Sequence, residues 1–136
     1  MKFSSSTDIN APSETIWAAV NDPEGWSQWV PSIKKVERVS KGPLGVGAQV
    51  RVTAKAGITV KLLMTITEFV PKQRVIMEGK ILGTKLIRSY TLKPLNHKTR
   101  FTASGEVSGP SAWLIRRGGQ ALSDEIVQAL KKKIEG

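Results

Sequence analysis

An arginine and a tyrosine lie close together in an apolar stretch of the sequence, at Arg88 and Tyr90. Leu86 and Leu92 flank them at the same two-residue spacing, so on a β-strand all four side chains lie on one face. A guanidinium on such a face can donate paired hydrogen bonds to a carboxylate or a carbonyl oxygen. The spacing therefore favours a site that orients an acidic or carbonyl group of a ligand.

Arg88 also has two interpretations that give it no role in binding. It can form an ion pair with a carboxylate on a neighbouring strand, for which Glu68, Glu78 and Glu106 are the candidates. The face that it shares with Tyr90 can also be the outer one, because a shift of one residue in register reverses every strand assignment.

Trp26 and Trp29 lie in a short segment between Pro23 and Pro31. Such tryptophans either anchor their segment to the core or line the mouth of a cavity, where an apolar ring with a polar edge is useful.

Two adjacent glycines, Gly118 and Gly119, lie in a stretch with helical periodicity. Each costs about 1 kcal/mol relative to alanine in a helix. They either mark a break between a lead-in turn and the main helix, or they leave room for a ligand and allow the helix to bend.

The composition excludes several kinds of chemistry. The chain has no cysteine, which excludes disulfides, thiolate zinc sites and cysteine nucleophiles. Its one histidine, His97, lies in a predicted turn, so a histidine-based metal site or a Ser-His-Asp triad is hard to build. We identify no pair of nucleophile and base and no metal-ligand spacing, and we expect neither a metal nor a cofactor.

The charge is strongly basic, with 21 Lys and Arg against 11 Asp and Glu and a net charge of +10. The basic residues are spread along the chain and no nucleic-acid recognition motif is present, so a nucleic-acid partner is not expected. Arg116, Arg117 and the run Lys131–Lys133 form a solvated helix face, or they hold the helix against an anionic membrane. The oligomeric state is not predicted.

The length of 136 residues fits one domain, residues 1–136. No stretch approaches the apolar length of a membrane span, and residues 1–6 lack the apolar core of a signal peptide. A cytoplasmic location is the default expectation.

Alternating apolar residues predict strands at residues 2–9, 33–39, 48–56, 58–67, 74–80, 85–93 and 99–107. Helical spacing predicts a short helix after Asn10–Glu14, a helical turn over residues 23–29, and a long helix over Ala112–Ile134. We expect the chain to turn back around Gly57 and the last six strands to form an antiparallel meander. The apolar stripe of the long helix is predicted to contain Leu114, Gly118, Ala121, Leu122, Ile126, Ala129, Leu130 and Ile134.

Several local patterns resemble a known family. They are Ile9–Trp17 at the first helix, the Trp-x-x-Trp segment within Asp22–Pro31, and the turns at Gly45–Gly47, Glu68–Arg74 and Thr99–Thr102. Their order and spacing along the whole chain are similar to those of the START-like (SRPBCC) superfamily. This superfamily contains the polyketide cyclase and lipid-transport proteins and the birch-pollen allergen type.

The resemblance implies an α+β helix-grip fold, in which a curved antiparallel sheet of about seven strands wraps around one long C-terminal helix, with two short helices besides. It also implies a cavity between sheet and helix, which side chains fill in some members and a ligand occupies in others. The predicted lining consists of Trp26, Trp29, Val50, Val52, Val60, Leu62, Met64, Met77, Leu86, Arg88, Tyr90, Trp113, Arg117 and Leu122.

The leading hypothesis is a non-catalytic protein that binds or carries a hydrophobic small molecule such as a lipid, an isoprenoid or a polyketide. One alternative is a cyclase or dehydratase in which Arg88, Tyr90 or a strand glutamate moves protons in the same cavity. A second alternative is a protein-interaction module of the co-chaperone type, since a fold does not determine a function.

Overall fold

The computed structural model describes residues 1–56 and 58–136, except for the side chains of residues 56 and 58. The predicted turn at Gly57 lies outside the described residues. In chain order the elements are β1 (Lys2–Ile9), α1 (Ser13–Val20), the 3-10 helix η1 (Pro23–Gln28), β2 (Ile33–Arg38), β3 (Gln49–Ala56), β4 (Ile58–Val70), β5 (Arg74–Ile81), β6 (Thr84–Leu95), β7 (Lys98–Ser108) and α2 (Ala112–Glu135).

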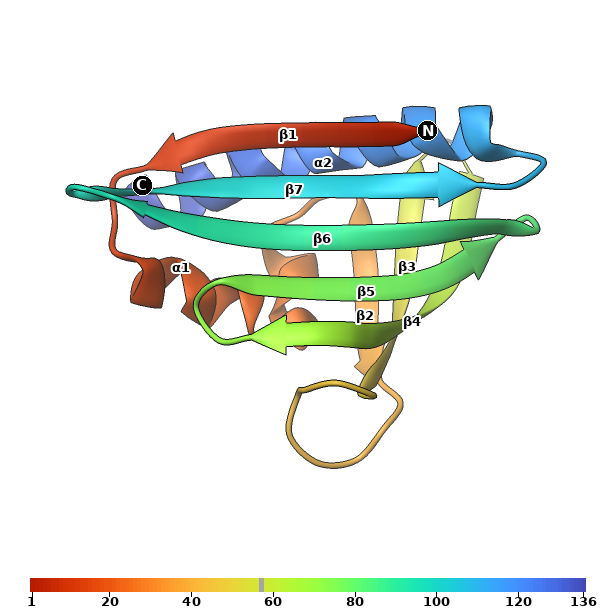
Figure 1. Cartoon of the computed structure of the whole chain (residues 1–136), viewed down its shortest axis with the longest axis horizontal. Coiled ribbons are helices and arrows are strands. Elements are labelled where there is room, and N and C mark those ends of the chain that lie inside the picture. Colours follow the sequence, from red (N-terminus) through yellow and green to blue (C-terminus); the bar gives the residue numbers. More distant parts are fainter. Residues whose placement is uncertain (57) are drawn as a thin grey trace.

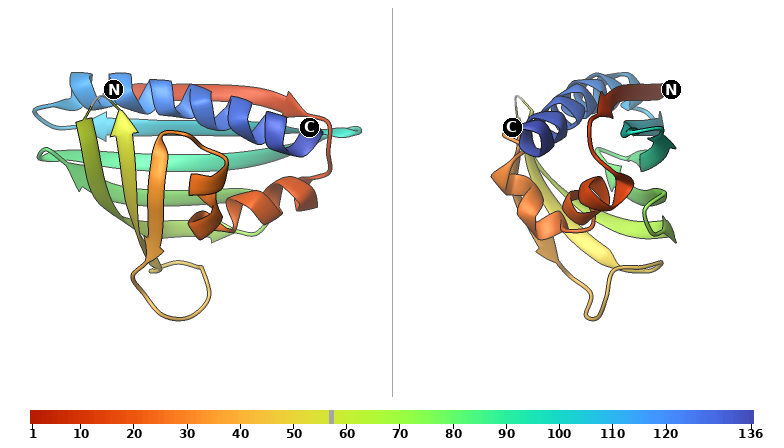
Figure 2. Two further views of the ribbon diagram at one scale, coloured as in Figure 1. Left: turned by 180° about the vertical axis from the view of Figure 1, so that it is seen from behind. Right: turned by 90° about the vertical axis from the view of Figure 1, so that its left-hand side faces the viewer.

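The strands form one seven-stranded antiparallel sheet in the order β1-β7-β6-β5-β4-β3-β2 (Figure 1). Strands β2 to β7 are neighbours in chain order and form a meander. The first strand, β1, lies at one edge of the sheet and pairs with the last strand, β7. The sheet curves, and α1, η1 and α2 all lie on its concave side (Figure 2). The predicted α+β helix-grip fold is confirmed.

Alternation along the strands determines which side chains face the helices. On β6 the buried residues are Thr84, Leu86, Arg88, Tyr90 and Leu92, at every second position. The register places Arg88 opposite Gly105 of β7, and Gly105 opposite Phe3 of β1. Arg88, Gly105 and Phe3 therefore lie in one row across the concave face of the sheet, which we call the inner face.

The buried positions of α2 are Ser123, Ile126, Val127 and Leu130. The predicted stripe is therefore correct in the C-terminal half of the helix and wrong at Leu114 and Ala121, which are both exposed. Trp113, Leu114 and Ile115 are three consecutive apolar residues, so periodicity alone does not reveal which of them faces inward. Ile115 is the one that packs against the core.

The helix continues through Gly118 and Gly119, so the predicted break is not present. A Cβ atom on Gly119 would lie 2.6 Å from Cζ of Phe3, whereas one on Gly118 would meet no atom within 4 Å. A Cβ on Gly105 would also collide with the Phe3 ring. Phe3 is thus wedged between two glycines, and Gly119 is what allows α2 to approach the sheet.

Strand β1 is at the edge of the sheet, and side chains of α2 bind its free backbone groups. Gln120 accepts a hydrogen bond from the Ser4 amide at 3.3 Å and donates one to the Ser4 carbonyl at 2.9 Å. One turn earlier, Arg116 Nε donates to the carbonyl of Lys2 at 2.9 Å. Covering an edge in this way prevents it from pairing with another chain.

The same arrangement continues at the other end of β1. Lys131 Nζ donates to the carbonyl of Asp8 at 2.7 Å, and Glu135 accepts a hydrogen bond from the Asn10 amide at 2.9 Å. Lys131 and Glu135 also form an ion pair at 3.0 Å. In the described part of the chain, no helix is long and apolar enough to cross a membrane.

The two adjacent glycines give a matched test of this packing. We expect Gly118→Ala to raise the free energy of unfolding by about 1 kcal/mol, because alanine favours the helix and meets no neighbour. We expect Gly119→Ala to lower it by about 1–3 kcal/mol, because its Cβ would overpack the Phe3 ring. Urea denaturation of both variants measures the difference, and equal effects would contradict the wedge.

A second prediction concerns acid. The hydrogen bond from the Asn10 amide, followed by that from Lys131, holds the pKa of Glu135 below its usual value. A lowered pKa in the folded state stabilises the fold above the unfolded-state pKa, about 4.3 for glutamate, and the effect disappears as the pH falls through the folded-state pKa. Glu135→Gln should therefore be less stable than wild type at neutral pH and should approach wild type in acid. Urea denaturation across this pH range measures the stability difference between Glu135→Gln and wild type. A difference that is constant with pH, or equal to that of the exposed Glu24→Gln control, would refute the role of Glu135.

Candidate functional site

Arg88 lies at the centre of the inner face and is only 6% exposed. Its Nε donates a hydrogen bond to the hydroxyl oxygen of Tyr90 at 2.9 Å, and its Nη2 donates to Oγ of Ser123 at 2.9 Å. Ser123 in turn donates to the carbonyl of Gly119 at 2.7 Å. One strand and the long helix thus hold the guanidinium through neutral groups.

Aromatic rings surround this cation. Its Cζ lies 5.7 Å from the ring centroid of Phe3 and 5.5 Å from that of Tyr90. Tyr90 stacks on Phe101 with centroids 6.1 Å apart and meets the edge of Trp26 at 5.7 Å. Cation–π attraction favours such a site, but it does not neutralise the charge.

The three glutamates that could have paired with Arg88 lie elsewhere. Glu68 binds Arg74, with 2.6 Å between Oε2 and Nε, and Glu78 lies 3.7 Å from Lys85. Glu106 is exposed, at a position of β7 whose side chain faces the outer side of the sheet. Among the described residues Arg88 therefore has no carboxylate partner, although its guanidinium retains its charge in proteins.

A small apolar cavity lies next to this cluster on the inner face, with a volume of about 10 Å³. It is lined by Val20, Trp26, Trp29, Val30, Ile33, Tyr90, Phe101 and Ile126. This volume is at the lower limit for a single water molecule. Side chains therefore fill most of the space between sheet and helix in this structure.

The inner face is less well covered at β3 and β4. Helix α2 packs mainly on β1 and β7 (Figures 1 and 2). Val60 and Leu62 belong to the inner face, opposite Ala54 and Val52, yet they are only partly buried. This part of the inner face is therefore less completely covered than the part near Arg88.

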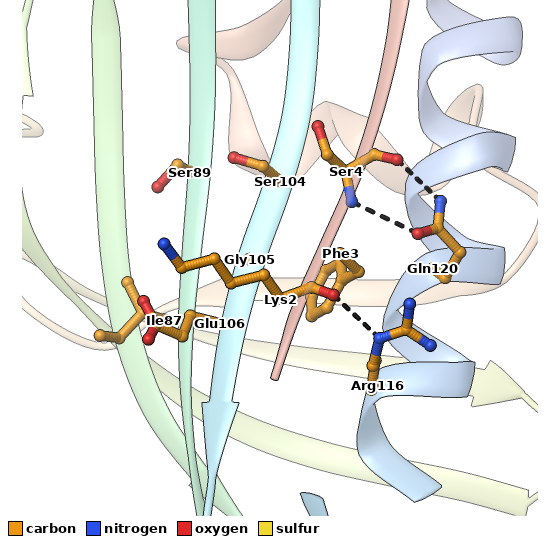
Figure 3. Close-up of a pocket in the computed structure, with 10 residues that line it drawn as sticks. All are labelled: Lys2, Phe3, Ser4, Ile87, Ser89, Ser104, Gly105, Glu106, Arg116 and Gln120. Carbon is orange, nitrogen blue, oxygen red and sulfur yellow. Dashed lines mark hydrogen bonds between the residues drawn. The ribbon is translucent and has the colours of Figure 1, made fainter. Parts of the chain in front are cut away.

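A larger hollow lies on the opposite, outer face of the sheet, with a volume of about 480 Å³ (Figure 3). Its lining is Lys2, Phe3, Ser4, Ile87, Ser89, Ser104, Gly105, Glu106, Arg116 and Gln120. This groove is open, with polar and apolar surface in about equal parts, and it was not predicted. Its Arg116 and Gln120 are the side chains that bind the β1 backbone (Figure 3).

Most of the residues predicted to line a cavity lie on the inner face. The strand residues in this group are Val50, Val52, Val60, Leu62, Met64, Met77, Leu86, Arg88 and Tyr90. Trp26 is buried, with its Nε1 donating to the carbonyl of Ala19 at 3.2 Å, while Trp29 and Leu122 are partly buried against the core. Their contact with a ligand remains a prediction.

Trp113 and Arg117 do not join this group. Trp113 is 58% exposed, and Arg117, one turn later, is also exposed. The side of the helix that faces the sheet contains Ile115, Gly119 and Ser123. Trp113 and Arg117 lie two positions from these residues and therefore face outward.

Sequence reasoning missed Phe3, Phe101 and Ser123. Ser123 lies four residues after Gly119 and three before the buried Ile126, so helical spacing places it on the side of the helix that faces the sheet. A small polar residue at such a position was the signal that could have identified it. Among the described residues no group of three or more His, Asp or Glu could hold a metal.

Comparison with known families identifies the chain. The model of the family described as polyketide cyclase/dehydrase and lipid transport matches residues 1–135. The chain belongs to this family. A search of curated proteins found no match.

Solved structures share the fold at low sequence identity. A START superfamily protein from Mycobacterium smegmatis is 19% identical with a TM-score of 0.81, over 98% of this chain and 97% of that one. Ara h 8.0201 is 17% identical with a TM-score of 0.78, over 99% and 97%. The Zhui aromatase/cyclase from Streptomyces sp. R1128 is 13% identical with a TM-score of 0.81, over 99% and 93%.

Proposed function

We propose that this protein binds an apolar small molecule through its inner face and that Arg88 receives an acidic or carbonyl oxygen of that molecule. The observation that carries the proposal is the burial of Arg88 among neutral partners, with Tyr90 and Ser123 as its hydrogen-bond acceptors. The family description, which includes lipid transport, supports a carrier of a lipid, an isoprenoid or a polyketide.

The energetic argument is that a buried cation without a counter-ion is costly. Desolvation of an ion costs several kcal/mol even after relaxation, and neutral acceptors return only part of it. An apolar residue at position 88 would stabilise the empty protein at least as well. A carboxylate or carbonyl oxygen of a ligand would complete the hydrogen bonding of the guanidinium and offset this cost.

The apolar part of the ligand requires space that the structure does not yet provide. Met77 lies directly across from Arg88 on β5, and Met64 is buried on β4. Methionine side chains adapt to irregular shapes, so these two can move aside for a ligand. The partly covered Val60 and Leu62 mark the side from which it would enter.

The test compares an acid with its neutral ester. We expect Arg88→Met to bind cis-parinaric acid about tenfold more weakly than wild type, because a hydrogen bond to a charged group contributes about 1.5–3 kcal/mol. Affinity for methyl parinarate should fall by a smaller factor, because the ester carbonyl can accept a hydrogen bond from Arg88 but carries no charge. Fluorescence titration measures both.

Arg51→Met is the matched control, since Arg51 is exposed on the outer face of β3. Thermal unfolding should show that Arg88→Met remains folded. Equal affinity of wild type and Arg88→Met for the acid would refute the role of Arg88. Failure of wild type to bind either probe would refute the binding function itself.

A second candidate is a cyclase or dehydratase, favoured by the geometry of Tyr90. Its oxygen accepts a hydrogen bond from Arg88, so its own proton is free to be donated to a ketone oxygen of a folded chain. The interior would then act by holding that chain in a reactive shape.

For this candidate we expect Tyr90→Phe to abolish turnover of a poly-β-ketone substrate while binding falls less than tenfold, as product analysis and titration would show. If Tyr90→Phe cyclised the poly-β-ketone at the wild-type rate, Tyr90 would have no part in the reaction. Absence of turnover in wild type would leave the carrier as the function.

A further inference from the structure

One end of the molecule presents large apolar side chains to solvent. Leu82 is 60% exposed at the β5–β6 turn, and Trp113 and Leu114 are 58% and 45% exposed in the first turn of α2. The turn and the start of the helix lie at the same end of the sheet (right-hand end of Figure 1). Ser111 joins them, because its Oγ donates to the Leu82 carbonyl at 3.0 Å. We call Leu82, Trp113 and Leu114 the apolar tip.

Leu82 is a poor choice for the stability of its own turn. Leu82 and Gly83 both have positive φ, 50° and 76°, in a two-residue connection between β5 and β6. Such turns favour Asn or Asp at the first position, and leucine rarely adopts this backbone conformation. Neither backbone preference nor solvation favours an exposed leucine here, which indicates a role outside the folded monomer.

Basic residues surround the apolar tip. Lys80 and Lys85 flank the turn as a directly opposed cross-strand pair, and Arg116 and Arg117 follow in the next turn of α2. All four are exposed, and only Lys85 forms an ion pair within the described part of the chain. From residue 79 to residue 123 the sequence contains one acidic residue, Glu106.

We propose that the apolar tip docks on an anionic lipid bilayer. Tryptophan and leucine enter the boundary between headgroups and acyl chains, while lysine and arginine contact anionic headgroups. The three apolar side chains belong to two elements, a hairpin turn and the first turn of a helix, at one end of the molecule. The charge complementarity, with four cations around three apolar side chains, determines the choice of an anionic bilayer.

Two kinds of variant separate docking from folding. Leu82→Asn should hold or raise the melting temperature, because asparagine suits the turn, yet it should lower partitioning onto vesicles of equal parts phosphatidylglycerol and phosphatidylcholine by about tenfold. Lys80→Gln and Arg117→Gln should each lower it by about fivefold. Two controls should leave partitioning unchanged. Val46→Ser removes an apolar side chain that is 71% exposed on the distant β2–β3 loop, and Lys133→Gln removes a cation at the far end of α2.

The measurement is vesicle co-sedimentation, together with a blue shift of tryptophan fluorescence. Trp113 is the one tryptophan whose ring is mostly exposed, so wild type should show the shift and Trp113→Ser should not. Equal partitioning of wild type and Leu82→Asn, or equal binding to pure phosphatidylcholine, would overturn the proposal. The proposal would also be overturned if the protein did not bind vesicles but self-associated, and if Trp113→Ser abolished that self-association. The apolar tip would then be a protein interface. Arg88→Met should dock like wild type, so the outcome is independent of the ligand site.

Discussion

The close approach of α2 to the sheet at Phe3 is the contact on which the rest of the structure depends. The ring lies between Gly105 and Gly119, where any side chain would collide with it. This contact sets the height of the helix above β1 and β7, and at that height Gln120 can reach both backbone groups of Ser4. Once the helix is placed there, Ser123 comes within hydrogen-bond distance of Arg88. A packing constraint at two glycines thus positions the Arg88 cluster.

The same placement explains why the site is asymmetric. A single helix cannot cover a curved seven-stranded sheet evenly, and this one lies over β1 and β7. The region near Arg88 is consequently tightly packed with aromatic rings, while Val60 and Leu62 toward the other edge are only partly covered. Tight packing fixes the orientation of the guanidinium, and the less covered side contains side chains that can move. A binding site needs both properties, since the polar group must be preorganised and the apolar volume must adapt.

The fold was predictable from sequence to a greater degree than the site. Period-two alternation located the strands and placed Arg88 and Tyr90 on one face, because alternation is a local property of the chain. The partners of Arg88 could not be predicted in this way. Phe3 and Ser123 come from opposite ends of the sequence and meet only through sheet register and helix phase. Three consecutive apolar residues at the start of α2 left that phase ambiguous, and the lining expected at Trp113 and Arg117 does not reach the interior for this reason.

Arg88 and Leu82 have one property in common, although they lie in different environments. A cation is buried without a carboxylate partner among the described residues, and a leucine is exposed at a turn position whose positive φ suits asparagine. Positions that break a local preference at a cost in stability are where function is expected. The N-terminal half of α2 connects the two: Gly119 and Ser123 on its inner side belong to the Arg88 cluster, and Trp113 and Leu114 on its outer side belong to the apolar tip. The two proposals thus place their residues on one helix, but in different turns and on opposite sides of it.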